Sequence, residues 1–300
     1  MHVRVVVPAK NEARSLPALL DSVHAAIAVA RAEHPDWAID VVVVAHRCVD
    51  DTAAVARDRG AVVVVCDVAG GKVEALRAGL NDADCFVCID ADVVVGPRTI
   101  RDLVTALLAS SSTLATCPPL AVPGAPAKWT PLAWALWRYN RARGFSKERL
   151  WLSGRCYAVR HVTFPTITEM TKRAETAGVL AGPLLADDIW LSRALLAQGD
   201  DAIVHVDTDP VVFRPPATFS GMARTWRRLR RELRRIDVLF PELPSPGRDR
   251  RIDMRGRPLA DHVALAIFRA ALRLVRWQGR FFDDDDEDEA WPVIAESKVP

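Results

Sequence analysis

Several absences in this chain of 300 residues narrow its class before any motif is considered. No apolar run approaches the ~20 residues that a membrane span requires, and segment 1–8 is not built like a signal peptide. The formal net charge is only +2, so the charge of the whole molecule favours no particular partner. The six cysteines lack a disulfide-framework spacing, which is typical of free thiols in a reducing compartment. We therefore expect a soluble cytoplasmic protein, with peripheral contact at the inner membrane face left open.

Three motifs are absent as well. Cys85 and Cys88 form a CxxC, but on one strand they would point to opposite faces, and no second pair follows to complete a zinc site. The loop after the first apolar run, Pro8-Ala9-Lys10-Asn11-Glu12, is not the GxGxxG of a Rossmann dehydrogenase. It is also not the glycine-rich basic loop that usually opens a nucleotidyltransferase. Both enzyme classes are therefore disfavoured.

Apolar runs alternate with helical periodicities through the first 117 residues. Valine-rich segments typical of buried strands cover 3–7, 39–45, 61–66, 84–89 and 114–117. Helical patterns lie between them at 15–30, 52–59, 72–80 and 100–108. Alternation of this kind predicts an α/β fold: an open, mostly parallel sheet with helices on both faces.

Polar clusters follow four of these strands, at Pro8–Glu12, His46–Asp51, Gly70–Lys72 and Asp90–Asp92. In such sheets, ligands bind beyond the carboxyl ends of the strands, so the four clusters indicate one site. Asp90 and Asp92 share one side of their strand and can converge on a divalent cation, Mn²⁺ or Mg²⁺. The alternative for this pair alone is a strand that ends in a solvated turn. Lys72 opens a helix, where its charge and free N–H groups suit phosphate.

The second half of the chain is less regular. A tryptophan-rich stretch around 129–139 is a helix, a lid or plain core packing. Segment 152–159 is predicted to be a strand interrupted by Gly154, and 202–206 and 211–213 are further strands. Helix 187–196 begins with Asp187 and Asp188, although one acid would be enough to complement the macrodipole. The second acid suggests a further role.

A helix predicted over 219–236 carries arginine on one face and apolar residues on the other. The arginines are Arg224, Arg227, Arg228, Arg231, Arg234 and Arg235, and the apolar residues are Met222, Trp226, Leu229 and Leu233. This basic face is a solvated surface, a clamp on a phosphate-bearing substrate or a dock for an anionic membrane. Nucleic acid is disfavoured, because no aromatic platform accompanies the arginines.

The C-terminal part divides into three segments. A proline- and arginine-rich linker covers 241–258, and a helix is predicted over 259–280. An acidic tail over 281–300 is expected to be disordered. The apolar stripe predicted for the helix consists of Val263, Ala264, Ile267, Ala270, Ala271 and Leu274.

Five stretches together resemble the ordered motifs of the family 2 glycosyltransferases with a GT-A fold. They are Val5–Ala13, Cys48–Thr52, Gly71–Leu80, Asp90–Asp92 and Asp187–Leu191, and they occur in the family's order over about residues 1–235. The resemblance implies a GT-A domain over 1–240, with a nucleotide-binding half at 1–118 and an acceptor half at 119–240. The helical C-terminal extension lies outside it.

The resemblance also implies roles for individual residues. Pro8, Ala9, Glu12, His46 and Asp50 would surround the base and ribose of a UDP- or GDP-sugar, with Lys72 near the diphosphate. Asp90, Ala91 and Asp92 would face the nucleotide, and Asp92 with Asp90 would hold the metal. Asp188, paired with Asp187, would be the general base for inverting transfer to an unidentified acceptor hydroxyl. Contacts to the acceptor or diphosphate would come from Gly154, Arg155, Arg224, Trp226 and Arg227.

Asp187 stands where the family's acidic pair usually has Glu, which is a conservative departure, and two other departures from the family pattern matter more. Ala45-His46-Arg47-Cys48 occupies the position of an Asp-Asp-Gly-Ser-like loop, which leaves the choice of nucleotide open. The Gln-x-x-Arg-Trp motif of processive members is missing, so a single transfer is favoured over polymer synthesis. The alternative function is a non-catalytic or nucleotidyltransferase-like nucleotide-binding protein that uses its arginine-rich helix to bind an anionic partner or membrane surface.

Overall fold

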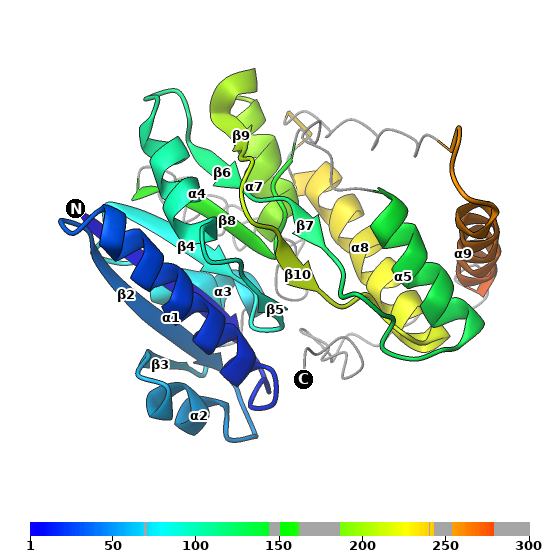
Figure 1. Cartoon of the computed structure of the whole chain (residues 1–300), viewed down its shortest axis with the longest axis horizontal. Coiled ribbons are helices and arrows are strands. Elements are labelled where there is room, and N and C mark those ends of the chain that lie inside the picture. The colour runs from blue at the N-terminus through cyan, green and yellow to red at the C-terminus, as the bar shows by residue number, and fades with distance from the viewer. Residues whose placement is uncertain (69–70, 144–150, 162–186, 240, 243–253, 279–300) are drawn as a thin grey trace.

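The computed structural model describes residues 1–68, 71–143, 151–161, 187–239, 241–242 and 254–278 (Figure 1). The first half contains β1 His2–Ala9, α1 Leu16–Glu33, β2 Ala38–His46, α2 Thr52–Asp58, β3 Val62–Cys66, α3 Gly71–Gly79, β4 Cys85–Ile89, β5 Val93–Val94, α4 Thr99–Leu108 and β6 Ala115–Cys117. The second half contains β7 Leu120–Ala121, α5 Pro131–Arg143, β8 Cys156–Arg160, α7 Asp187–Leu196, a 3₁₀ turn at Asp200–Ala202, β9 Ile203–His205, β10 Val211–Phe213, α8 Phe219–Leu239 and α9 Leu259–Gln278.

Seven strands form the central sheet in the order β3-β2-β1-β4-β8-β6-β9. Strand β8 runs antiparallel to both of its neighbours, whereas the other neighbouring pairs are parallel. The predicted open, mostly parallel sheet is therefore confirmed. Strand β8 brings the segment around Gly154 and Arg155 beside the carboxyl end of β4, with Ile89 opposite Cys156.

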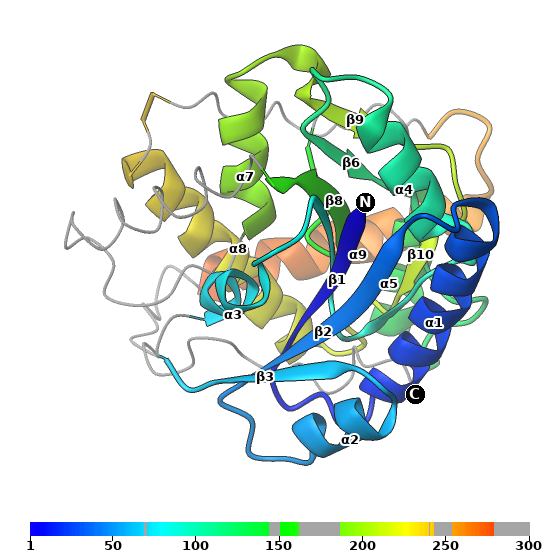
Figure 2. The same cartoon turned by 90° about the vertical axis from the view of Figure 1, so that its left-hand side faces the viewer.

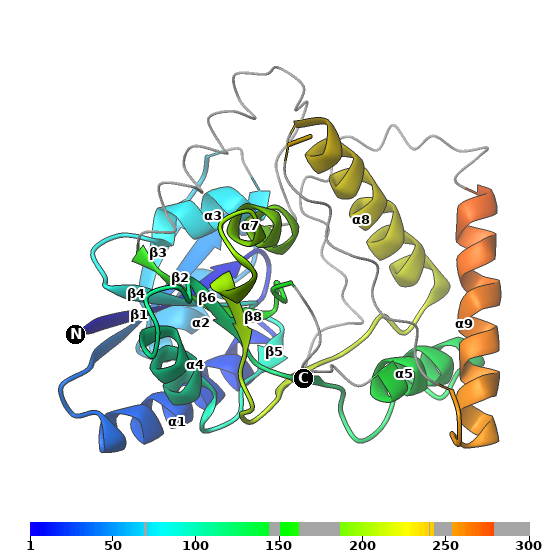
Figure 3. The same cartoon turned by 90° about the horizontal axis from the view of Figure 1, so that it is seen from above.

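Helices cover both faces of this sheet, because alternate residues of each buried strand point to opposite sides. Val5 and Val7 pack with α1, α2 and α4 on one face, and Val6 packs with α3 and α7 on the other. Figures 2 and 3 show the sheet between these two layers. The carboxyl ends of the parallel strands β1, β2 and β4 lie at one edge of this sheet.

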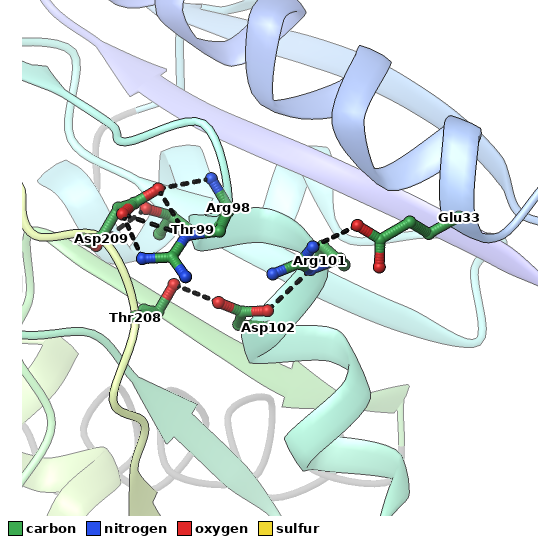
Figure 4. A network of polar contacts seen from close by, with 7 residues as sticks. All are labelled: Glu33, Arg98, Thr99, Arg101, Asp102, Thr208 and Asp209. Atoms are coloured by element: carbon green, nitrogen blue, oxygen red, sulfur yellow. Dashed lines mark hydrogen bonds and ion pairs between the residues drawn. The ribbon is translucent and has the colours of Figure 1, made fainter.

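A second, smaller sheet has the order β5-β10-β7, and its two shortest strands were not predicted. The turn before β10 is held on α4 by a surface network (Figure 4). Asp209 accepts hydrogen bonds from the Arg98 backbone and guanidinium, and Thr208 donates to Asp102. Arg101 pairs with Asp102 and with Glu33 of α1. These contacts fix the strand that carries Phe213 against the first half of the chain.

Helices α5, α8 and α9 form a separate hydrophobic cluster to one side of the sheet (Figure 3). The tryptophan-rich stretch is the helix α5, in which Leu136 is buried. The predicted apolar face of α8 is confirmed, since Met222 is buried, Trp226 packs in this cluster, and Leu229 and Leu233 pack against the sheet side. No described helix is both long enough and apolar enough to cross a membrane.

The predicted apolar stripe of α9 is only partly confirmed. Ala264 is buried and Ala271 packs against the cluster, as predicted, but Val263 and Leu274 are exposed, and the buried Phe268 and Val275 were not predicted. The helix carries apolar residues on two faces, so periodicity alone did not distinguish them; the contact with α5 and α8 decides. The acidic tail and most of the linker lie outside the described residues.

Candidate active site

Lys72 is the centre of a cluster at the carboxyl edge of the sheet, where it joins residues far apart in the sequence. Its Nζ lies 2.7 Å from Asp90 Oδ1 and 2.9 Å from Asp187 Oδ1, and it donates to the Gly154 carbonyl at 2.9 Å. An ammonium has three N–H donors, so these contacts use all of them. Burial alone would lower the pKa of Lys72, but the carboxylates of Asp187 and Asp90 more than offset it and raise that pKa.

The two acids that open α7 have different surroundings. Asp187 is 3 % exposed, and its second oxygen accepts a 2.8 Å hydrogen bond from the Tyr157 hydroxyl. Burial raises the pKa of Asp187 to about 6, against the opposing charge of Lys72. Asp188 is only half-buried, and its Oδ2 accepts the Gly154 N–H at 3.0 Å. Asp187 is thus enclosed by protein, whereas Asp188 is partly exposed.

The close contact between the backbone at position 154 and the Asp188 carboxylate requires a glycine. A Cβ at this position would lie 3.0 Å from both Cγ and Oδ2 of Asp188, which is tighter than ordinary contact. The glycine therefore lets its backbone N–H reach the carboxylate while its carbonyl receives Lys72.

Arg155 follows Gly154 and lies among the carboxylates of the site. Its guanidinium stacks over the Phe213 ring at 3.8 Å, and its carbonyl accepts the Asp90 N–H at 2.9 Å. Burial lowers the pKa of Arg155, and Arg228 of α8 lowers it further. The carboxylates of Asp90, Asp92 and Asp188 act in the opposite direction. Arg228 of α8 thus adds positive charge near the site.

Asp90 and Asp92 fit a hard divalent cation. Burial, followed by the nearby charge of Asp90, raises the pKa of Asp92 to about 6, and a cation would offset both effects. Within the described residues, no cluster of three or more His, Cys, Asp or Glu side chains could hold a metal by itself. Two carboxylates that leave positions for substrate phosphate and water suit Mg²⁺ or Mn²⁺.

The loops predicted around the nucleotide lie side by side. Ala13 N–H donates to Asp50 Oδ2 at 3.1 Å, and Glu12 N–H donates to Thr52 Oγ1 at 2.7 Å. The Asp50 carboxylate also accepts the Thr52 N–H, so it shapes the loop and the start of α2. Pro8 and Ala9, the last two residues of β1, lead into these contacts.

Two further predicted residues are buried at the same edge. His46 ends β2, and its Nε2 lies 2.9 Å from the Val68 carbonyl. Burial lowers the pKa of His46, which keeps the imidazole neutral at pH 7. Ala91 is 4 % exposed and separates Asp90 from Asp92.

The structure does not bring every predicted residue to the cluster. Arg224 and Arg227 are exposed on α8, and Trp226 packs with α5 and α9. The sequence did not single out Tyr157 and Phe213. Tyr157 could have been found from the alternation of side chains along a strand. Residues 155 and 157 lie on the same side of a strand, and Arg155 was already a predicted site residue. Phe213 reaches the site through pairing of β10 with β5, which no sequence pattern indicated.

A model of the family described as glycosyltransferase-like family 2 matches residues 2–235. Two solved structures of glucosyl-3-phosphoglycerate synthase from Mycobacterium tuberculosis share the fold. One, in complex with Mn²⁺, UDP and glucosyl-3-phosphoglycerate, has a TM-score of 0.50 and 20 % identity, covering 81 % of each chain. The other, in complex with phosphoglyceric acid, has a TM-score of 0.50 and 22 % identity, covering 82 % of this chain and 81 % of that one. Among curated proteins, none matches.

The match with the family model extends over most of the chain and includes all the residues of the Lys72 cluster. The mostly parallel sheet of this protein and the helices on its two faces agree with the fold of the synthase structures. The protein is a glycosyltransferase and belongs to glycosyltransferase-like family 2.

Proposed function

We propose that this glycosyltransferase moves a sugar from a UDP-sugar to an acceptor hydroxyl, in a single transfer that inverts the anomeric carbon. One observation carries the proposal: the Lys72 cluster joins the Asp90–Asp92 strand end to the first turn of α7, which bears Asp188. A metal-binding pair and a carboxylate base are thereby adjacent. The synthase complex that contains UDP and Mn²⁺ supports this choice of nucleotide.

Each group has a distinct task in the proposed reaction. Asp92 and Asp90 would hold a divalent cation, whose charge would offset that of the departing diphosphate. Asp188 would take the proton of the acceptor hydroxyl, and its half-buried carboxylate, which accepts the Gly154 N–H, supports this role. A base on the acceptor side and a leaving group on the strand side suit in-line attack with inversion.

The acceptor in this proposal carries an anionic group. Arg155 is half-buried near the proposed base, and Arg228 adds positive charge from α8. A phosphate or carboxylate on the acceptor would complement these arginines. The synthase complexes with phosphoglyceric acid and glucosyl-3-phosphoglycerate are consistent with such an acceptor.

A thermal-shift panel of nucleotides and nucleotide sugars, each with and without Mn²⁺, tests the proposal. We expect UDP and UDP-sugars to raise Tm only when Mn²⁺ is present, because a ligand that binds the folded state stabilises it by mass action. Asp92→Asn should remove the metal-dependent part of the shift. Positive donors would then be assayed with 3-phosphoglycerate as acceptor. If no nucleoside diphosphate raises Tm and Asp92→Asn behaves like the wild type, the transferase assignment fails and the non-catalytic alternative gains support.

A further inference from the structure

Lys72 has no N–H group left for a donor phosphate. Its three contacts, to Asp90, Asp187 and the Gly154 carbonyl, are between 2.7 and 2.9 Å, and its side chain is 12 % exposed. A lysine that served as a phosphate ligand would direct at least one N–H toward the substrate. The arrangement instead suits a residue that holds other residues in place.

The contacts of Lys72 lead to Asp188 by two routes. Asp187 is the residue before Asp188 at the start of α7, so fixing its carboxylate fixes the first turn of that helix. Gly154 offers its carbonyl to Lys72 and its N–H to Asp188, so the same peptide segment connects the ammonium to the base. Tyr157 supports the first route from β8.

We propose that Lys72 is a positioning residue, which ties the metal-site strand to the helix start that bears Asp188 and so sets the distance between donor and base. This inference rests on the proposed function. Asp187 is the second positioning residue of the tie, since it is only 3 % exposed and its carboxylate is held by Lys72 and Tyr157. Asp188 alone then acts as the base.

A double-mutant cycle on the full chain tests the tie with Lys72→Met, Asp187→Asn and the double variant. Lys72→Met leaves the Asp187 carboxylate buried without its cation, so turnover should fall by about 10²-fold through misplacement of Asp188. Asp187→Asn in that background removes the uncompensated charge and should recover at least about tenfold of the loss. The Kd for UDP with Mn²⁺ should change far less than turnover in every variant, because among the contacts of Lys72 only the one to Asp90 reaches the nucleotide side of the site. Arg77→Met on the same helix is the matched control, because it removes a cation paired with Glu74 and should leave turnover unchanged.

The outcomes are distinct. If Lys72→Met and the double variant weaken UDP binding equally and turnover does not recover, Lys72 is a diphosphate ligand and the tie is overturned. The proposed function fails separately, if the wild type binds no UDP with Mn²⁺. In that case the tie is still measured by Tm, because it requires the Tm losses of the two single variants to be non-additive. Additive losses would refute it.

Discussion

Two networks of the molecule pair basic side chains with carboxylates in opposite surroundings. The Lys72 cluster joins α3, the end of β4, the turn before β8 and the start of α7. The Arg98–Asp209 network joins α4 to the turn before β10, and Arg101 extends it to α1 (Figure 4). Both connect distant segments through a cation between carboxylates. The Lys72 and Asp187 side chains are 12 % and 4 % exposed, whereas those of Arg98 and Asp209 are 56 % and 24 % exposed.

The difference in burial determines whether each network is explained by stability or by function. An exposed ion pair contributes little to stability and is tolerated anywhere on a surface. Removing one partner of a buried pair costs about 3–5 kcal/mol, because it leaves an uncompensated charge. A well-packed apolar group would often stabilise the fold equally well at such a site. The buried network therefore calls for a functional explanation, and the exposed one is explained as a structural link.

Among the substitutions in and around the two networks, Asp188→Asn should cause the largest loss of turnover. The amide oxygen can still accept the Gly154 N–H, so the geometry is kept while the base is lost. Turnover should fall by about 10²–10⁴-fold, the usual contribution of a general base, with UDP–Mn²⁺ affinity nearly unchanged. Steady-state kinetics and calorimetric titration with UDP provide the measurements. Full activity in Asp188→Asn would remove Asp188 from the mechanism.

Each network lies beside a glycine, so the same substitution, glycine to alanine, can be compared at the two networks. A Cβ on Gly154 would press on the Asp188 carboxylate, and a Cβ on Gly96 would lie 2.2 Å from Asp209 Cβ. We expect Gly154→Ala to lower turnover by about 10–100-fold, because small displacements of a catalytic group are costly. Gly96→Ala should lower Tm by a few degrees and leave turnover unchanged.

Parallel measurements of turnover and Tm on both alanine variants decide this point. Equal losses of turnover would mean that the exposed network also positions the site. A loss of Tm without loss of turnover in Gly154→Ala would mean that Asp188 tolerates displacement and is not the base.

The sequence located the carboxylates of the site because strand ends of a parallel sheet share one edge. Asp90, Asp92 and Lys72 could be placed together on that argument, and the family resemblance added Asp188. The partners of Lys72 could not be predicted, since they depend on β8 entering the sheet antiparallel between β4 and β6. Phe213 likewise depends on a strand pairing between two short segments. Local patterns encode the elements, whereas these contacts arise from tertiary placement.

Asp209→Asn should give the smallest effect, and the size of this effect depends on pH. Hydrogen bonds from Arg98 hold the pKa of Asp209 below its usual value of 3.8, so the ionised carboxylate is favoured in the folded state. Its contribution to stability is therefore complete at pH values well above 3.8 and is lost as the pH falls through the lowered pKa. We expect Asp209→Asn to lower Tm slightly at pH 7, with UDP binding unchanged, and we expect the Tm difference from the wild type to shrink as the pH falls below about 4. Thermal melts from pH 7 to pH 3 measure the difference, with Asp21→Asn as a control that removes another surface partner of an arginine, Arg59. If the Tm difference instead stayed constant from pH 7 to pH 3, the Asp209 carboxylate would not owe its effect to ionisation, and the exposed network would be held by hydrogen bonds that an amide also loses.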